Sequence, residues 1–168
     1  MSRARSSTSA AAQDLEQALG IYRDMGDRRG QANALGELGV VRRMTDDYPA
    51  AAQDLEQSLS IYRDLGNQSA EAEALNDRGT LHRVSGELEQ AERYHRHALG
   101  LARGIADSWD EAHALAGLGR CALAAGHVAQ AEILLRQALE IFQRIGAAGE
   151  APELRAELDA LTGPPPAQ

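Results

Sequence analysis

The stretch AAAQDLEQALGIYRD at Ala10–Asp24 returns as AAAQDLEQSLSIYRD at Ala50–Asp64, forty residues later and with only two positions changed. Looser copies follow at the same spacing, starting with Gln-Ala-Glu at Gln90–Glu92 and again at Gln130–Glu132. Self-similarity at a fixed period of this length is typical of proteins that stack one small structural unit many times. The forty-residue period therefore decides the fold class before any single residue is considered.

Each forty-residue unit divides into two helical halves. Leu35, Leu38 and Val41 recur every three residues in the first half, and Ala51 and Leu55 begin a similar apolar face in the second. Spacings of three and four place these side chains on one face of a helix, and no period-two pattern persists anywhere in the chain. The periodicity predicts an all-α protein of about eight helices, at 8–25, 30–45, 48–65, 70–85, 88–105, 109–125, 128–145 and 151–161.

The links between the helices carry start signals. Thr45–Asp47 forms a short turn in which Asp47 is a predicted N-cap, and Pro49 falls in the first helical turn, where its missing N–H costs nothing. The connection from one helix pair to the next is expected to be longer. Ser108–Glu111 has the pattern of a capping box at the start of the following helix.

Glycines recur inside the first helix of each pair, at Gly39, Gly79 and Gly119. A glycine in a helix interior costs about 1 kcal/mol relative to alanine, so three in register need a compensating gain. An alanine follows twelve residues later each time, in the second helix. We interpret this pairing of small residues as a close approach between the two helices of a pair.

This arrangement resembles the tetratricopeptide repeat. Leu-Gly, then Ala, a large apolar residue and a small residue follow one another at the family's spacing, although Leu35, Leu75 and Leu115 stand where the family often has Trp. The resemblance implies a right-handed superhelix of antiparallel helix pairs, with about six extra residues in each inter-repeat loop. The forty-residue form is similar to arrays in bacterial signalling and transcription regulators. The matching positions are Leu38-Gly39, Ala51, Leu55 and Ser58, then Gly79, Ala91 and Ala98, then Leu118-Gly119, Ala131, Leu135 and Ala138.

We expect one array over residues 9–161, between a flexible N-terminus at 1–8 and a proline-rich tail at 162–168. Terminal repeats of such arrays are atypical because they cap the exposed core. The polar residues Arg155 and Asp159 interrupt the repeat pattern near the end, which indicates a cap. The expected divisions are a half repeat 9–26, full repeats 30–65, 70–105 and 109–145, and a capping helix 151–161.

The first helix corresponds to the second half of a repeat whose first half is absent from the sequence. Its apolar face is therefore expected to stay partly open, and two explanations remain. Either the chain is the C-terminal part of a longer array, or residues 9–25 form a homodimer with a second copy. The residues expected in such self-association are Ala11, Leu15, Leu19 and Tyr22.

Composition excludes several classes of function. The net charge of −8 argues against nucleic-acid binding, which needs clustered cations, and no stretch is long and apolar enough to span a membrane. The lone Cys121 cannot form an internal disulfide, which favours a cytoplasmic location. No catalytic or metal-binding motif is present, so we expect neither an enzyme nor a cofactor.

The family resemblance implies a groove lined by the first helix of each pair, suited to a protein or peptide partner. Its residues are mixed in charge, with acids and three arginines, as an extended peptide or a partner helix would require. The alternative is a solvated face with no ligand. The implied groove residues are Asn33, Glu37, Val40, Arg43, Glu73, Asn76, Asp77, Thr80, Arg83, His113 and Arg120.

The middle repeat places polar residues at core-type positions. His95 stands where other repeats have Leu, Arg78 replaces Leu38 and Leu118, and His82 lies one turn further on. Unpaired polar groups in a core are costly. Two hypotheses follow: a polar cluster that binds an anion or titrates near neutral pH, or local hydrogen bonds with Arg78 reaching the surface.

Together these observations predict a protein- or peptide-binding scaffold, the C-terminal part of a cytoplasmic regulator. One alternative is a ligand- or peptide-sensing domain of a signalling regulator, whose groove changes shape on binding. Another is a structural scaffold that self-associates through the open first helix.

Overall fold

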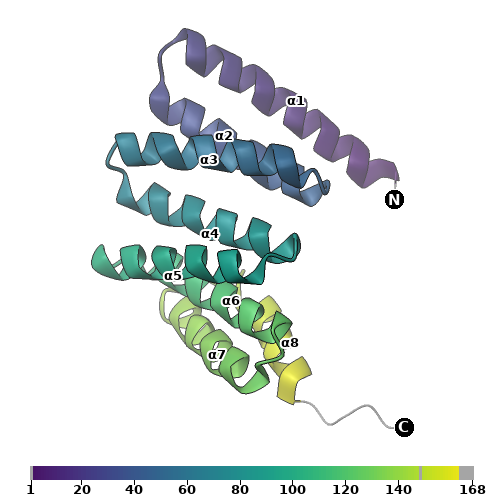
Figure 1. The fold of residues 1–168 in the computed structure, drawn as a ribbon, viewed down its shortest axis with the longest axis vertical. Coiled ribbons are helices and arrows are strands. Elements are labelled where there is room, and N and C mark those ends of the chain that lie inside the picture. Colours follow the sequence, from purple (N-terminus) through teal and green to yellow (C-terminus); the bar gives the residue numbers. More distant parts are fainter. Residues whose placement is uncertain (1, 148, 163–168) are drawn as a thin grey trace.

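The computed structural model describes residues 2–147 and 149–162. Within this part the secondary structure is entirely helical, and Figure 1 shows the helices stacked in chain order, with α1 at one end and α7 and α8 at the other. This confirms the predicted all-α fold. The helices are α1 (Ser2–Asp24), α2 (Arg28–Met44), α3 (Tyr48–Asp64), α4 (Gln68–Val84), α5 (Leu88–Gly104), α6 (Ser108–Ala124), α7 (Val128–Arg144) and α8 (Ala151–Thr162).

A twenty-residue module underlies the forty-residue repeat. Each helix from α2 to α7 has 17 residues, and three residues link each helix from α1 to α6 to the next. The middle residue of the link adopts a positive φ every time, even where it is Asp46 or Ala106 rather than glycine. The residue after it donates its N–H to the carbonyl five positions back, as Asn67 does to Tyr62 at 3.0 Å. This is the bond that closes a Schellman motif, and it turns the chain sharply into the next helix.

The link lengths correct one expectation from the sequence. The connections between repeats are no longer than those within a repeat, so the extra residues relative to the usual 34-residue unit lengthen the helices instead. The reason is that an N-cap follows the turn immediately. The side chains of Asp27 and Asn67 accept hydrogen bonds from the N–H groups of Gly30 at 2.9 Å and Ala70 at 3.3 Å, which starts the next helix at once.

Two further boundaries differ from the prediction, while Asp47 is confirmed as an N-cap that accepts from Ala50 N–H at 3.3 Å. The cap of α6 is Asp107, whose carboxylate accepts from two backbone N–H groups at 3.1 Å, and Ser108 is the first helical residue rather than the cap. Helix α1 begins at Ser2 instead of residue 8, because residues 2–10 contain no glycine or proline to end it.

The core lies between the first helix of each pair (the A-helices α2, α4 and α6) and the second (the B-helices α3, α5 and α7). Ala51 and Leu55 on α3 are fully buried against α2. A β-carbon added at Gly39 would lie 2.5 Å from Leu55 Cγ, and one at Gly119 would lie 2.8 Å from Leu135 Cγ. The expected close approach is confirmed, since these glycines provide the space that the leucines fill.

Replacing Gly39 by alanine should therefore destabilise the protein, although alanine is the better helix former. We expect Gly39→Ala to lower the free energy of unfolding by about 1–3 kcal/mol, because the new methyl group overpacks Leu55. Gly100→Ala is the matched control, since a β-carbon at Gly100 would meet no atom within 4 Å. That variant should gain about 0.5–1 kcal/mol. Urea denaturation of both variants measures the difference, and a stabilised Gly39→Ala protein would contradict the packing argument.

Candidate functional site

A cavity of 660 Å³ opens on the side of the A-helices that the sequence assigned to the groove. We call it the acidic pocket. Helices α1, α2, α3 and α4 all contribute to it, and it brings together five of the eleven expected groove residues: Asn33, Glu37, Val40, Glu73 and Asp77. Gly36, which also falls on the expected groove wall, lines it as well, and the remaining lining residues were not assigned to the groove: Ala11, Asp14, Leu15, Val41, Ser58, Tyr62, Ala70 and Ala74.

Carboxylates dominate the electrostatics of the acidic pocket. Burial raises the pKa of Asp77 to about 7, and the nearby charge of Glu73 adds to the shift, while Arg43 opposes it. The hydroxyl of Tyr62 donates to Asn33 Oδ1 at 2.6 Å, which fixes both side chains at the wall of the pocket. The Asp77 carboxyl group therefore has a raised pKa in the free protein.

Helix α1 exposes residues that its near-copy α3 buries. Ala51 and Leu55 on α3 are fully buried, whereas Ala11 and Leu15 at the same repeat positions are only partly covered and line the acidic pocket. No A-helix of the described chain packs on that side of α1. Of the other residues expected in self-association, Leu19 is buried against the core and Tyr22 is partly buried.

The three groove arginines differ in their contacts. Arg120 is held by Glu157 of α8, with its Nη2 2.7 Å and its Nε 3.1 Å from the same carboxylate oxygen. Within the described residues, Arg43 and Arg83 form no ion pair, and the Nε of Arg43 is buried without a hydrogen-bond partner. Burial lowers the pKa of Arg83, and Arg120 adds to that effect. Two cations therefore remain available on the groove face, while the capping helix occupies the third.

Two expected groove residues serve the core instead. Asn76 is buried, and its amide joins His95 Nδ1 at 3.1 Å to the carbonyl oxygen of Asp110 at 3.3 Å. His113 stacks among aromatic rings, with its centroid 4.8 Å from Trp109 and 5.0 Å from Phe142. Thr80 is partly exposed on α4 and does not line the acidic pocket.

The side chains of Arg78 and His82 both contact Tyr94, which is not among the expected site residues. The Arg78 guanidinium lies 4.7 Å above the centre of the Tyr94 ring and forms an ion pair with Glu56. The His82 ring stacks on the same tyrosine, with centroids 5.1 Å apart. Arg78 is buried, and its Nε and both ring nitrogens of His82 have no hydrogen-bond partner among the described residues, so neither of the two sequence hypotheses is decided. Tyr94 occupies the position of Asp54 one repeat earlier, which was the available signal.

His95 points elsewhere, into the close contact between α4, α5 and α6. Only 1% of its surface is exposed, and β-carbons at Gly79 and Gly117 would lie 2.6 Å and 2.3 Å from its ring. Burial, together with the charges of Arg83 on α4 and Arg120 on α6, lowers the pKa of His95 to about 3. The ring is therefore neutral at pH 7, and its Nε2 has no hydrogen-bond partner among the described residues.

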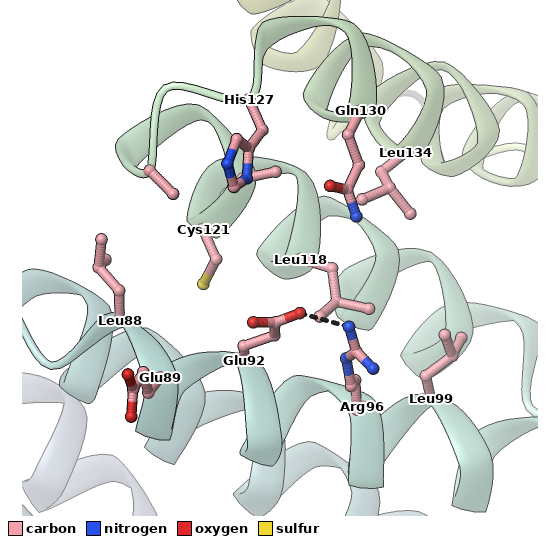
Figure 2. A pocket seen from close by; sticks show the side chains of 12 residues that line it. Leu88, Glu89, Glu92, Arg96, Leu99, Leu118, Cys121, His127, Gln130 and Leu134 are labelled. Atoms are coloured by element: carbon pink, nitrogen blue, oxygen red, sulfur yellow. Dashed lines mark hydrogen bonds and ion pairs between the residues drawn. The ribbon is translucent and has the colours of Figure 1, made fainter.

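A second cavity, of 400 Å³, lies between α5, α6 and α7 (Figure 2). At the preceding junction the large side chains Arg78, His82 and Tyr94 fill the equivalent space, but here Leu118, Ala122 and Leu134 stand in their places. The sulfur of Cys121 faces the cavity, and Glu92 and Arg96, one turn apart on α5, pair at 2.5 Å on one side of it. The side chains that line this second cavity include both acids and a base.

The described part of the chain contains no group of three His, Cys, Asp or Glu side chains arranged to hold a metal ion. None of its helices is long and apolar enough to cross a membrane.

The buried histidine predicts a specific pH dependence. Unfolded His95 should titrate near 6.5 and folded His95 near 3, so between these values the unfolded chain binds a proton that the folded protein excludes. Stability from this source is fully present above pH 6.5 and falls by about 1.4 kcal/mol per unit as the pH drops further. His95→Leu should remove that loss.

The measurement is the free energy of unfolding of His95→Leu minus that of the unmodified protein, from pH 7.5 to pH 5. This difference should rise as the pH falls, whereas the exposed His97→Gln control should leave the pH profile unchanged. A difference that is flat with pH would show that His95 can be protonated in the folded state.

Comparisons with known proteins agree with this architecture. A family model described as tetratricopeptide repeat matches residues 70–144. BtubC (BKLC) from P. vanneervenii superposes with a TM-score of 0.69 at 20% identity over 97% of this chain. A putative kinesin light chain from Podosopora anserina, described as having nearly identical TPR-like repeats, and its Q17M variant superpose with TM-scores of 0.66 at 17% identity over 94% of this chain.

The chain spans 62% of the length of BtubC, and 88% and 87% of the two kinesin light chain structures. No protein of curated function matches its sequence. At these identities the superpositions establish the fold alone. The family match extends over residues 70–144, and the superpositions show that the described chain has a helical-repeat fold similar to that of TPR-like repeat proteins.

Proposed function

We propose that this protein is a non-catalytic scaffold whose groove face holds an extended segment of a partner protein. The observation that carries the proposal is a set of charges left unpaired on that face. Arg43 and Arg83 lack ion pairs within the described chain, and so does Asp77. Proteins with this repeat fold generally act as protein-interaction scaffolds.

Some charges elsewhere on the array are matched across the links between helices. Arg63 pairs with Glu71 at 2.8 Å across one link, and Arg103 pairs with Glu111 at 2.8 Å across the equivalent link one repeat later. Solvent-exposed pairs such as these add little stability, commonly below about 1 kcal/mol.

The repeat also sets the order of the groove charges. Glu37 and Arg43 lie six residues apart on α2, and Asp77 and Arg83 lie six apart on α4. Six residues correspond to about 9 Å along a helix axis. The groove face is therefore acidic near the middle of these A-helices and basic near their C-terminal ends. A partner segment that carries both signs of charge would complement it.

A cytoplasmic regulator remains the setting that we propose. The forty-residue period resembles arrays in bacterial signalling and transcription regulators, and the single Cys121 is buried and unpaired. A buried free thiol suits a reducing compartment.

The groove arginines provide the test. Peptides selected on the unmodified protein from an unbiased display library would be measured by fluorescence anisotropy. We expect Arg43→Gln/Arg83→Gln to weaken binding about tenfold or more, which corresponds to about 1.4 kcal/mol. Arg93→Gln/Arg155→Gln, which removes two exposed arginines outside the groove, should leave affinity within about twofold. Equal losses in both variants would contradict a groove site.

Self-association through α1 is a second candidate. The observation in its favour is that Ala11 and Leu15 remain partly exposed where Ala51 and Leu55 are fully buried. A second copy could cover this surface by packing α1 against α1.

Light scattering over a concentration series tests this candidate. If α1 pairs with itself, the protein should be a dimer at micromolar concentration, and Leu15→Glu should return it to a monomer because it places a charge in the apolar contact. A monomer throughout the series would reject the candidate.

A further inference from the structure

We propose that the acidic pocket binds an arginine or lysine side chain of the partner, while aliphatic residues of the same segment pack on its apolar wall. This inference rests on the proposed function, since it names the chemistry of one end of the bound segment. The residues that line the pocket come from α1, α2, α3 and α4, the four helices at the N-terminal end of the array (Figure 1).

The charge of the pocket calls for a cation. Four carboxylates line it and no basic side chain does. None of the four forms an ion pair or a hydrogen bond within the described residues. They are Asp14, Glu37, Glu73 and Asp77.

The repeat itself shows which partner one of these acids lacks. Asp54 occupies the same repeat position as Asp14 and is held by the Arg42 guanidinium at 2.5 Å. No A-helix precedes α1 in the described chain, and the residue twelve positions before Asp14 is Ser2, an uncharged residue of α1 itself. The same sequence therefore has its guanidinium partner in one repeat and lacks it in the other. An arginine from outside the chain would complete the equivalent pair.

Glu16 and Glu56 show the same preference next to the pocket. Glu16 accepts from Arg42 at 2.7 Å, and Glu56 pairs with Arg78. In both cases a B-type helix supplies the carboxylate and an A-helix supplies the guanidinium. Arginine–carboxylate contacts thus join neighbouring helices at several places in this array, whereas the four pocket acids have no such partner among the described residues.

A cation bound in the partly buried pocket would stabilise the carboxylates more than a cation at an open surface would. Asp77 is partly buried beside Glu73, and both factors disfavour its negative charge. A guanidinium or ammonium group close to both acids would offset this repulsion. Arg43 acts on Asp77 from the C-terminal end of α2, but it does not line the cavity.

The shape and the wall favour a protein side chain over a bare ion. The cavity measures 660 Å³, and the described acids are not arranged to hold a metal. The wall between the carboxylates is aliphatic, including Leu15 and Val40. Arginine and lysine combine an apolar stem with a charged head, which matches a pocket of this composition.

Three labelled peptides of equal length test the proposal. Each has the same leucine and alanine frame, with arginine, glutamine or glutamate at the same two positions. The arginine peptide should bind the unmodified protein about tenfold more tightly than the glutamine peptide. Glu73→Gln/Asp77→Asn should abolish that preference. The control Asp24→Asn/Glu140→Gln, with the same change in net charge at exposed sites, should retain it.

A second readout separates local binding from a general charge effect. The carboxyl carbon of Asp77, followed by NMR, should titrate near pH 7 in the free protein. Its midpoint should move to lower pH when the arginine peptide is bound, because a cation stabilises the carboxylate. Circular dichroism of each variant confirms that the helices remain formed.

The outcomes separate this inference from the proposed function. Equal binding of the three peptides, or equal losses in the two acid variants, would overturn the cation pocket. Tighter binding of the glutamate peptide that depends on Arg43 and Arg83 would also overturn it while supporting a groove site. If neither these peptides nor any library-selected peptide binds, the proposed function fails as well.

Discussion

The contact between a glycine on each A-helix and the large side chain it faces on the B-helix is the constraint on which the array depends. At Gly39 and Gly119 the space left by the absent β-carbon is filled by leucine, and the two helices come close enough to bury the alanines beside it. Because close-packed interiors tolerate little change in volume, this contact has to be repeated in every pair. A different side chain can fill the space beside the glycine only if the residues around that space change as well.

The middle repeat shows how such a change is accommodated. His95 fills the space beside Gly79, and its ring also reaches α6 at Gly117, where the equivalent residues of α2 and α4 are Glu37 and Asp77. A side chain at 117 would collide with the ring. The imidazole can lie there only as the neutral form, since burial and two nearby arginines oppose its protonation. The histidine at position 95 therefore requires a glycine at position 117. As a result, the groove face of α6 has no acid where α2 has Glu37 and α4 has Asp77.

Periodicity in the sequence was enough to predict the helices, the cap at Asp47 and the glycine contacts, because each depends on residues close together in the chain or related by the repeat. It could not predict the length of the links. Asp46 and Ala106 adopt a left-handed conformation that their residue types do not predict. The N-caps at Asp27 and Asn67 shorten the connections.

The candidate site was predicted only in part. Asn33, Glu37 and Asp77, which the repeat pattern puts on one face, line one cavity, but the pattern treats every A-helix alike. Arg120 is neutralised by Glu157 of a helix outside the repeat pattern, and His113 is drawn into an aromatic contact with Trp109. These contacts depend on the helix at the end of the array and on single substitutions within a repeat. The pattern that all repeats share does not include either.

The equal spacing of the links has a consequence for how the gene can change. Since α1 and α3 are near-copies forty residues apart, recombination between the two coding segments would remove or add one complete unit in frame. Every helix, left-handed link and glycine contact beyond the junction would keep its phase, because the exchanged piece contains two whole modules. An array of this construction can change its length, and with it the size of the surface it offers, in a single genetic step that leaves the packing of the remaining repeats unaltered.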